Sequence, residues 1–175
     1  MNAFHFLTSQ PPDLLSFSIE GERLRLVAIS DLFERDIFNE FTSEITRYMF
    51  PSPAQHIEET RNFINESRRN MQIGNNLQCA ILSKTIGEFL GCCGLHGEDN
   101  VRTPELGIWL KKSAHGSGYG REAIHMLVNW SCDRIDLDRF IYPVDWKNIA
   151  SSKIAESLGG EVMKESKVKT PTGKI

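Results

Sequence analysis

Three glycines at alternate positions within residues 115 to 121 are the feature of this sequence that most directly indicates chemistry. The segment reads His115-Gly116-Ser117-Gly118-Tyr119-Gly120-Arg121, and a helix-forming stretch follows it at once. Glycine adopts backbone angles closed to other residues, and the first turn of a helix has unpaired N–H groups that bind anions. The segment therefore predicts a phosphate-binding loop that needs no lysine.

Two common phosphate-binding motifs do not fit this loop. The dinucleotide fingerprint G-x-G-x-x-G would need glycine where Arg121 stands, and the G-K-S/T of the Walker loop is absent. On the loop alone, a flexible surface turn without a ligand remains the alternative, because glycine-rich turns are common. The neighbouring segments favour the phosphate-binding interpretation.

The loop lies within a regular succession of predicted elements. Residues 105 to 110 are apolar and aromatic, as in a strand, and apolar residues recur at helical spacing from Ile124 to Ile135. Residues 139 to 144 predict a second strand, and a short helix after Asn148 ends at a glycine pair, a typical C-cap. The order is strand, glycine loop, helix, strand and helix.

This unit resembles the GNAT acyltransferase superfamily, specifically its branch of RimJ/RimL N-terminal protein acetyltransferases. The matching segments are E-L-G-I-W-L from residue 105, H-G-S-G-Y-G-R-E-A from 115, N-I-A-S from 148 and S-L-G-G from 157. In the family, a loop Q/R-x-x-G-x-G/A holds the pyrophosphate of acetyl-coenzyme A through its amides. Gly118 and Gly120 match the two small positions, and His115 stands where Gln or Arg is usual.

The resemblance covers residues 20 to 175 and implies an α/β (α+β) fold. The central sheet would be mixed, mostly antiparallel, flanked by helices and splayed between its fourth and fifth strands. Residues 105 to 110 would be the fourth strand, with a bulge, and residues 139 to 144 the fifth. Pro143 lacks an N–H, so it either marks the splay or simply ends the strand. Residues 1 to 19 would be an N-terminal extension, packed on the surface or partly disordered, before a single domain.

The resemblance also implies roles in acetyl transfer, where an amine attacks a thioester, an oxyanion develops, a proton leaves the nitrogen and a thiolate departs. Glu105 would deprotonate the acceptor amine, directly or through water, and Ser151 would protonate the thiolate. Asn148 would contact the pantetheine arm. The remaining cofactor contacts would come from Ile108, Trp109 and Leu110 and from the loop residues His115, Gly116, Ser117, Gly118, Tyr119, Gly120 and Arg121.

Each of these roles has a plainer alternative. Glu105 could be a surface strand residue in an ion pair, and Asn148 with Ser151 could be a helix N-cap pair, which is compatible with catalysis. Other branches of the family place a tyrosine general acid where this chain has Ala155. Tyr48 and Phe50 are proposed wall residues of the substrate groove.

The rest of the chain predicts further elements. Alternation favours a strand from Glu22 to Ile29, and four-residue spacing favours a helix from Asp31 to Ile45. Ser52-Pro53 resembles the start of a second helix with Ser52 as N-cap. Residues 77 to 83 and 88 to 95 predict a hairpin about the turn 84 to 87. Residues 160 to 167 would be a sixth strand, with the family's seventh either truncated or supplied by another chain.

Composition fits one domain of ordinary globular character. The chain has 175 residues, 40% apolar and 25% charged, and a formal net charge of −3. This charge gives no reason to expect nucleic-acid or membrane binding and mildly favours a cationic amine substrate. With no Lys or Arg in its first 20 residues and no apolar run of 18, we expect a soluble cytoplasmic protein, as monomer or homodimer.

Metal or redox chemistry is not indicated by the cysteines. Cys79, Cys92, Cys93 and Cys132 form no C-x-x-C motif, and no histidine pair lies at ligand spacing. Cys92 and Cys93 are adjacent in a predicted strand and so face opposite sides, which disfavours a disulfide between them. We expect buried free thiols and no metal site.

Three functions remain open from the sequence. The first is acetyl-coenzyme A-dependent acetylation of a primary amine, with a protein N-terminal α-amine as acceptor. The second is acetylation of a small amine such as an antibiotic, polyamine or amino acid, and the third is a cofactor-binding module without catalysis. An unperturbed α-amine, whose pKa is about 7.8, is roughly 15% neutral at pH 7, whereas deprotonating a lysine costs about 4.6 kcal/mol, so a single glutamate suits the α-amine better.

Overall fold

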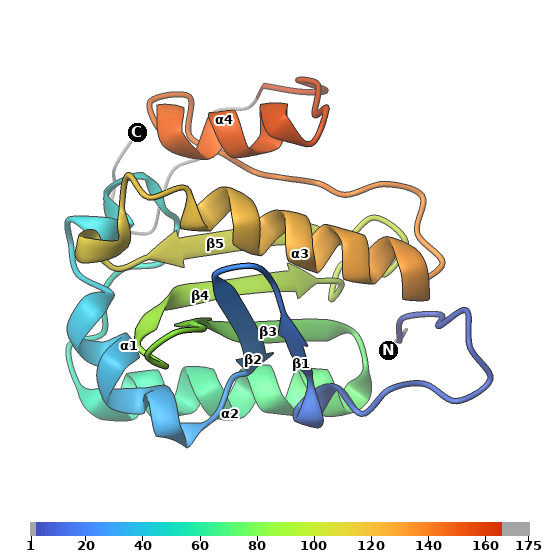
Figure 1. The fold of residues 1–175 in the computed structure, drawn as a ribbon, viewed down its shortest axis with the longest axis horizontal. Coiled ribbons are helices and arrows are strands. Elements are labelled where there is room, and N and C mark those ends of the chain that lie inside the picture. Colours follow the sequence, from blue (N-terminus) through green and yellow to red (C-terminus); the bar gives the residue numbers. More distant parts are fainter. Residues whose placement is uncertain (1–2, 166–175) are drawn as a thin grey trace.

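The computed structural model describes residues 3 to 165, and its central element is a five-stranded sheet (Figure 1). Each strand pairs antiparallel with the next in chain order. The strands are β1 (Ser18–Glu20), β2 (Leu24–Ala28), β3 (Asn76–Ser83), β4 (Phe89–His96) and β5 (Glu105–Leu110). The predicted mostly antiparallel sheet, including the hairpin of β3 and β4, is confirmed.

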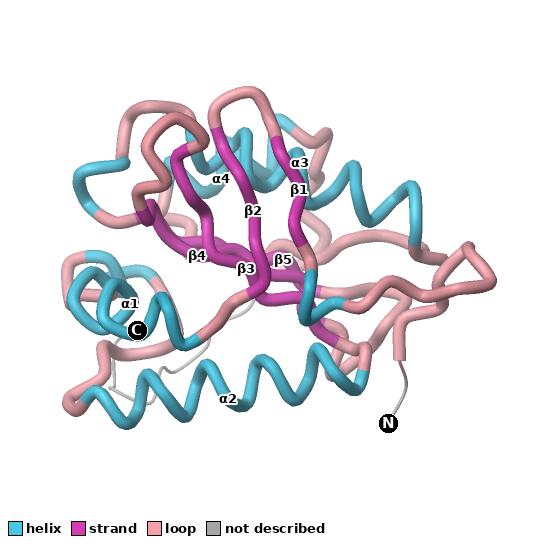
Figure 2. Tube along the Cα trace, turned by 60° about the horizontal axis from the view of Figure 1, so that its bottom comes forward, coloured by secondary structure: helices cyan, strands magenta, loops and turns pink. Residues whose placement is uncertain are grey.

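Helices cover both faces of the sheet (Figure 2). On one face lie α1 (Glu34–Glu40) and α2 (Ile57–Ile73), and on the other lies α3 (Tyr119–Arg134), with α4 (Ile149–Ser157) packed on α3. Ile64 of α2 and Leu127 of α3 are fully buried. Because both faces are covered, β3 and β4 are buried over nearly their whole length and form the centre of the core.

Three of the four cysteines lie in this core. Cys79, Cys92 and Cys93 are buried free thiols, as predicted, whereas Cys132 on α3 is exposed. Burial raises the pKa of the Cys79 and Cys92 thiols well above the ordinary value, since a thiolate would lose its hydration there. A low-pKa nucleophile is therefore not found at these two positions.

The two helices that precede β3 in the chain, α1 and α2, have other ends than the sequence predicts. α1 ends at Glu40, because Phe41 leaves the helical region, and a separate 3-10 turn follows at Ile45–Tyr48. α2 begins at Ile57 rather than near Ser52. The Glu59 carboxylate accepts hydrogen bonds from the N–H groups of Gln55 and His56, and it is this acidic group that fixes the helix start.

The N-terminal segment contributes to the core, which the sequence reading did not foresee. Phe4 and Phe17 are buried, and the rings of Phe6 and Phe17 contact Trp130 of α3 edge-on at centroid distances of 6.5 and 4.9 Å. A single antiparallel bridge joins Phe6 to Ile135. The proposed domain boundary at residue 20 falls at the end of β1.

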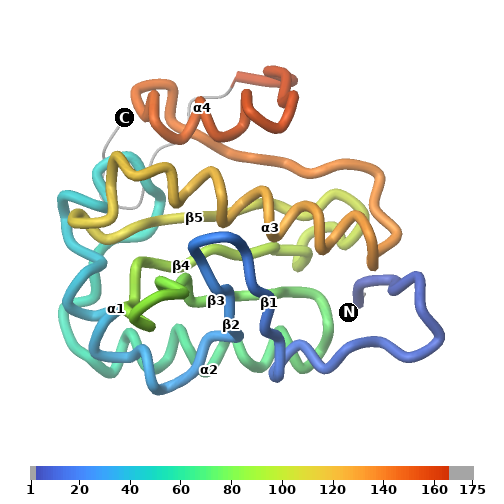
Figure 3. Tube along the Cα trace, in the orientation of Figure 1, coloured from blue at the N-terminus to red at the C-terminus, as the bar shows by residue number. Residues whose placement is uncertain are grey.

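The sheet opens beyond β5, as the predicted splay requires, but the predicted fifth strand is reduced to a single parallel bridge between Glu105 and Ile141. Pro143 cannot donate to a ladder, and the chain then leaves the sheet edge and runs back over α3 to α4 (Figure 3). The predicted sixth strand is also absent from residues 160 to 165, and its remainder lies outside the described residues.

The bulge expected in residues 105 to 110 is not seen in their ladder with β4, which runs without a register shift. The irregularity lies instead between β3 and β4, at Ile81 and Leu82. Among residues 3 to 165, no helix has the length and apolar character needed to cross a membrane.

Candidate active site

The glycine loop has the backbone geometry of an anion site. Gly116 and Gly118 have φ values of 78° and 77°, in the left-handed region that favours glycine, and Gly118 is the N-cap of α3. Within the described residues, the N–H groups of positions 116 to 121 make no hydrogen bond, and the first intrahelical bond runs from Glu122 to Gly118. These free donors lie at the positive end of the helix dipole, so the loop fits a pyrophosphate group.

Gly120 serves a different purpose from the other loop glycines, because it is buried. A Cβ atom at this position would lie 3.0 Å from Ile154 of α4 and 3.6 and 3.7 Å from Leu110 and Ile108 of β5. The missing side chain therefore lets the first turn of α3 approach both the open edge of β5 and α4. The three elements that could surround a bound cofactor meet at this residue.

Arg23, just before β2, fixes the loop from outside, and the sequence reading did not identify it. Its guanidinium pairs with Glu122 at 2.7 Å, donates to the Ser117 carbonyl at 2.9 Å and lies 4.9 Å from the ring centre of Tyr119. Its backbone N–H donates to the same Glu122 carboxylate at 2.8 Å. Nothing in local sequence could reveal these contacts, because Arg23 and Glu122 are 99 residues apart.

Replacing Arg23 is expected to weaken cofactor binding while the fold is retained. Arg23→Ala removes the contacts to Ser117, Glu122 and Tyr119, so the loop must be ordered when the pyrophosphate binds, and we expect an affinity loss of about 10-fold. Titration calorimetry with acetyl-CoA would measure it. Arg25→Ala, which removes an exposed arginine of β2, is the control and should bind like wild type. Equal affinities for both variants would contradict this role.

His115 lies in the loop where the family pattern has Gln or Arg, and its ring turns back toward the sheet. Its Nε2 donates to the carbonyl oxygen of Leu110 at 2.9 Å. This bond ties the loop to the end of β5, so His115 acts on loop geometry in this structure.

The backbone N–H and C=O groups of every second residue of β5 point to its open edge. The N–H of Leu106 donates to Ile141, and since neighbouring residues of a strand point their backbone groups to opposite sides, Ile108 and Leu110 also face this edge. Trp109 instead pairs with Cys92 of β4. Ile108 and Leu110 therefore remain candidates for backbone contacts to the pantetheine arm and thioester, whereas the backbone of Trp109 is turned away.

The side chain of Trp109 belongs to an aromatic cluster on the face of the sheet that α1 and α2 cover. Its ring lies 4.9 Å from that of Phe41 and 5.8 Å from that of Phe89, and Phe89 stacks on Phe33 at 5.9 Å. The cluster attaches α1 and its flanking turns to β4 and β5, next to the expected path of the acceptor.

The start of α4 brings Asn148, Ser151 and Tyr142 together. Asn148 is the N-cap, and its side chain accepts a hydrogen bond from the Ser151 N–H at 3.2 Å, so the cap interpretation is correct. The Ser151 hydroxyl is 2.8 Å from the hydroxyl of Tyr142, a residue the sequence reading passed over. Burial raises the pKa of the Tyr142 phenol, which therefore keeps its proton at neutral pH. The pair can supply a proton.

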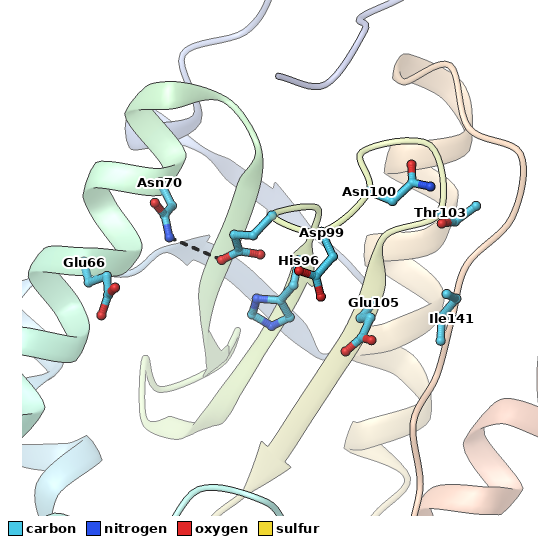
Figure 4. A pocket seen from close by; sticks show the side chains of 9 residues that line it. Glu66, Asn70, His96, Asp99, Asn100, Thr103, Glu105 and Ile141 are labelled. Atoms are coloured by element: carbon cyan, nitrogen blue, oxygen red, sulfur yellow. Dashed lines mark hydrogen bonds between the residues drawn. The ribbon is translucent and has the colours of Figure 1, made fainter. Parts of the chain in front are cut away.

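A cavity of about 470 Å³ lies where β4 ends and β5 begins (Figure 4). Two of its wall residues belong to α2, which places it on the face of the sheet opposite to α3. The wall includes four carboxylates and no lysine or arginine. Its residues are Glu66, Asn70, His96, Glu98, Asp99, Asn100, Thr103, Glu105 and Ile141.

Glu105 is thus a wall residue of an acidic cavity, at the point where the sheet opens. Tyr48 and Phe50, proposed from the sequence as groove residues, do not line it: Tyr48 ends a 3-10 turn and Phe50 is 57% exposed. His96 does line it and was missed, because no motif marks it. Its place directly opposite Glu105 follows from the β4–β5 register.

Comparison with known proteins shows relatives in sequence and in fold. The uncharacterized N-acetyltransferase p20 of Bacillus licheniformis is 28% identical over 141 residues, which is 78% of each chain. A Salmonella typhimurium acetyl transferase that modifies the N-terminal serine of ribosomal protein L7/L12 has a similar fold, with a TM-score of 0.69 at 20% identity over 78% of this chain and 80% of that chain. RimL, a ribosomal L7/L12 α-N-protein acetyltransferase solved with coenzyme A, gives 0.73 at 20% identity over 81% and 82%.

The acetyltransferase (GNAT) domain family matches residues 23 to 161, a range that contains the glycine loop, the open edge of β5 and the start of α4. Since this match spans most of the chain, the protein belongs to the GNAT family of acyltransferases, which use acetyl-CoA.

Proposed function

We propose that this acetyltransferase transfers the acetyl group of acetyl-CoA to a primary amine, and that the acceptor is a protein N-terminal α-amine. The observation that carries the proposal is the position of Glu105, in an acidic cavity at the point where β5 loses its neighbour. An amine entering from the α2 face would meet this carboxylate at the start of the strand whose Ile108 and Leu110 N–H groups face the open edge. The phosphate loop lies at the far end of the same open edge.

The charge of the cavity supports a cationic acceptor. Four carboxylates without a cationic wall residue raise the local concentration of an ammonium ion and orient it toward Glu105. An α-ammonium group, whose ordinary pKa is about 7.8, loses its proton far more readily than a lysine, so it needs only modest help from a base. RimL and the Salmonella enzyme act on the N-terminus of ribosomal protein L7/L12, which agrees with this choice.

In the proposed reaction, Glu105 removes the amine proton, directly or through a second group. The N–H groups of β5 at the open edge would stabilise the oxyanion, because donors already held in place need no reorganisation. Ser151, hydrogen-bonded to Tyr142, would return a proton to the departing thiolate. The loop at residues 116 to 121 would hold the pyrophosphate and so fix the thioester relative to the amine.

A thiol-release assay tests the proposal. Acetyl-CoA would be presented with a library of N-terminal peptides and, separately, with free polyamines, aminoglycosides and amino acids. Turnover of peptides, with mass spectrometry locating the acetyl group on the α-nitrogen, is expected. Turnover of free amines alone would favour the small-amine function, which the acidic cavity also fits. Cofactor binding without turnover on any amine would indicate a binding module and contradict the proposal.

The serine pair of α4 provides a matched test of the proton donor. Ser151→Ala should lower kcat by about 10- to 100-fold if its hydroxyl protonates the thiolate, and Tyr142→Phe should show part of this loss, since it removes the supporting phenol. Ser152→Ala is the control, because this neighbouring hydroxyl instead donates to the Asn148 carbonyl at 3.3 Å. Steady-state kinetics would show the difference, and a wild-type kcat in Ser151→Ala would leave Ser151 with its cap role alone.

A further inference from the structure

His96 and Glu105 face each other across the β4–β5 ladder. They are register partners, so their side chains leave the sheet on the same face, and both line the acidic cavity. Figure 4 shows the imidazole beside the Glu105 carboxylate. No hydrogen bond engages either ring nitrogen of His96 in the part of the chain that the structure describes, so the ring is not committed to a structural contact.

Two glycines make room for this ring. Gly94 and Gly107 are the next register partners on the same face, and Nε2 of His96 lies 2.7 and 3.1 Å from where a Cβ atom would stand on each. A side chain at either position would displace the imidazole. The ring is therefore laid along the sheet, from the Glu105 end toward the middle of β5.

This direction matters for the reaction. The N–H groups of Ile108 and Leu110, which face the open edge, are proposed to bind the thioester, and Gly107 directly precedes Ile108 in β5. Glu105 is two residues further back, about 7 Å along a strand. Nε2 of His96 lies over Gly107. Measured along β5, it is therefore closer than Glu105 to the expected position of the acyl group.

We infer that His96 is a further catalytic residue, which accepts the proton of the attacking amine and works with Glu105 as its partner. The inference rests on the proposed amine acetylation. The amine nitrogen bonds to the thioester carbon, the C–S bond breaks with its electron pair on sulfur, and one N–H proton moves to Nε2. The Ser151 hydroxyl protonates the thiolate, and the Ser151–Tyr142 pair then takes up a proton from solvent. The imidazolium, stabilised by Glu105, releases its proton to solvent through the cavity, so the enzyme returns to its starting state.

The protonation state of His96 suits this task. Burial lowers its pKa below the ordinary value, because it disfavours the charged ring, and this outweighs the opposing effect of Glu98. The other charged groups around the cavity are Glu66 on α2, Asp99 in the loop and Glu105 on β5. The ring is neutral at pH 7 and can accept a proton, and the surrounding carboxylates stabilise the imidazolium once it forms.

The test compares wild type with His96→Gln, using an acceptor that the wild type acetylates. We expect kcat to fall by about 10²- to 10⁴-fold, with the acceptor KM and the acetyl-CoA affinity within about 3-fold of wild type. In wild type, log kcat should decline at acidic pH below the lowered pKa of His96, and this decline should be missing from the residual activity of the variant. His125→Gln, at a half-buried α3 histidine bonded to Ser157, is the matched control and should keep both kcat and the pH profile.

A second variant separates chemistry from structure. His96→Ala opens a space over Gly94 and Gly107 that imidazole fits, so added imidazole should restore kcat in proportion to its concentration. A wild-type kcat and pH profile in His96→Gln, or a loss in His96→Ala that imidazole does not relieve, would overturn the inference alone. Absence of transfer by the wild-type protein to any amine would instead overturn the proposed function, and the role of His96 with it.

Discussion

Gly118→Val is expected to abolish acetyl-CoA binding. Gly118 has a φ of 77° at the N-cap of α3, and a β-branched side chain both disfavours that angle and stands where a phosphate must approach the amides. The strain alone would cost on the order of 1–3 kcal/mol, seen as lost stability or as a changed loop. Titration calorimetry with acetyl-CoA would measure the affinity, and thermal melting would confirm the fold.

Gly87→Val is the matched control for this substitution. Gly87 has a φ of 71° in the turn between β3 and β4, and a Cβ atom there would meet nothing within 4 Å. Both variants therefore carry similar backbone strain, but only position 118 lies in the proposed phosphate site. If the two bind acetyl-CoA equally well, the pyrophosphate assignment of this loop is wrong.

Glu105→Gln should lower kcat by at least about 100-fold while the affinity for acetyl-CoA is unchanged. The amide keeps the size of the side chain and its place in the cavity wall, but it can neither take up a proton nor stabilise the imidazolium of His96 by its charge. Because the main loss concerns a step that follows binding, it should appear mostly in kcat, while the acceptor KM should rise by no more than the few-fold that the loss of one cavity charge causes. Steady-state kinetics with varied acceptor at saturating acetyl-CoA would measure both constants.

Glu66→Gln removes one carboxylate from the same cavity without touching β5. It should raise the KM of a cationic acceptor a few-fold, through weaker electrostatic attraction, and leave kcat near wild type. This contrast separates attraction of the ammonium from removal of its proton. Equal changes in both variants would mean that Glu105 contributes only charge, and a wild-type kcat in Glu105→Gln would exclude it as a base.

Local sequence was enough to predict the parts of the fold that each consist of one continuous segment. The glycine loop, the helix after it and the β3–β4 hairpin depend on backbone freedom, apolar spacing and turn residues within short segments. The register of β4 and β5, which pairs His96 with Glu105, could not be obtained in this way. It depends on how two strands and a loop of eight residues, 97 to 104, fit together.

The errors in the sequence reading also have physical causes. Residues 139 to 144 have strand composition, yet they make one bridge at Ile141, although the edge of β5 is open. Pro143 has no N–H to donate to a ladder, and the chain leaves the sheet edge there. The start of α2 was misplaced because Glu59 satisfies the N–H groups before Ile57, and this overrides the preference of Ser52-Pro53 for a helix start. Phe6 and Phe17 do not recur at helical or strand spacing, so the sequence did not predict that they are packed in the core. Their contact is Trp130 of α3, which is distant in the sequence.

The sequence by itself determined the glycine loop, the strand that precedes it and the acyltransferase family, and it named Glu105 as a candidate base. The tertiary structure alone decided which groups join them: Arg23 at the loop, Tyr142 beside Ser151, and His96 opposite Glu105 in an acidic cavity. A loop conformation is set by the angles of its own residues, whereas a reaction site is set by distances between side chains from separate elements. Those distances exist only after the helices have packed on the sheet.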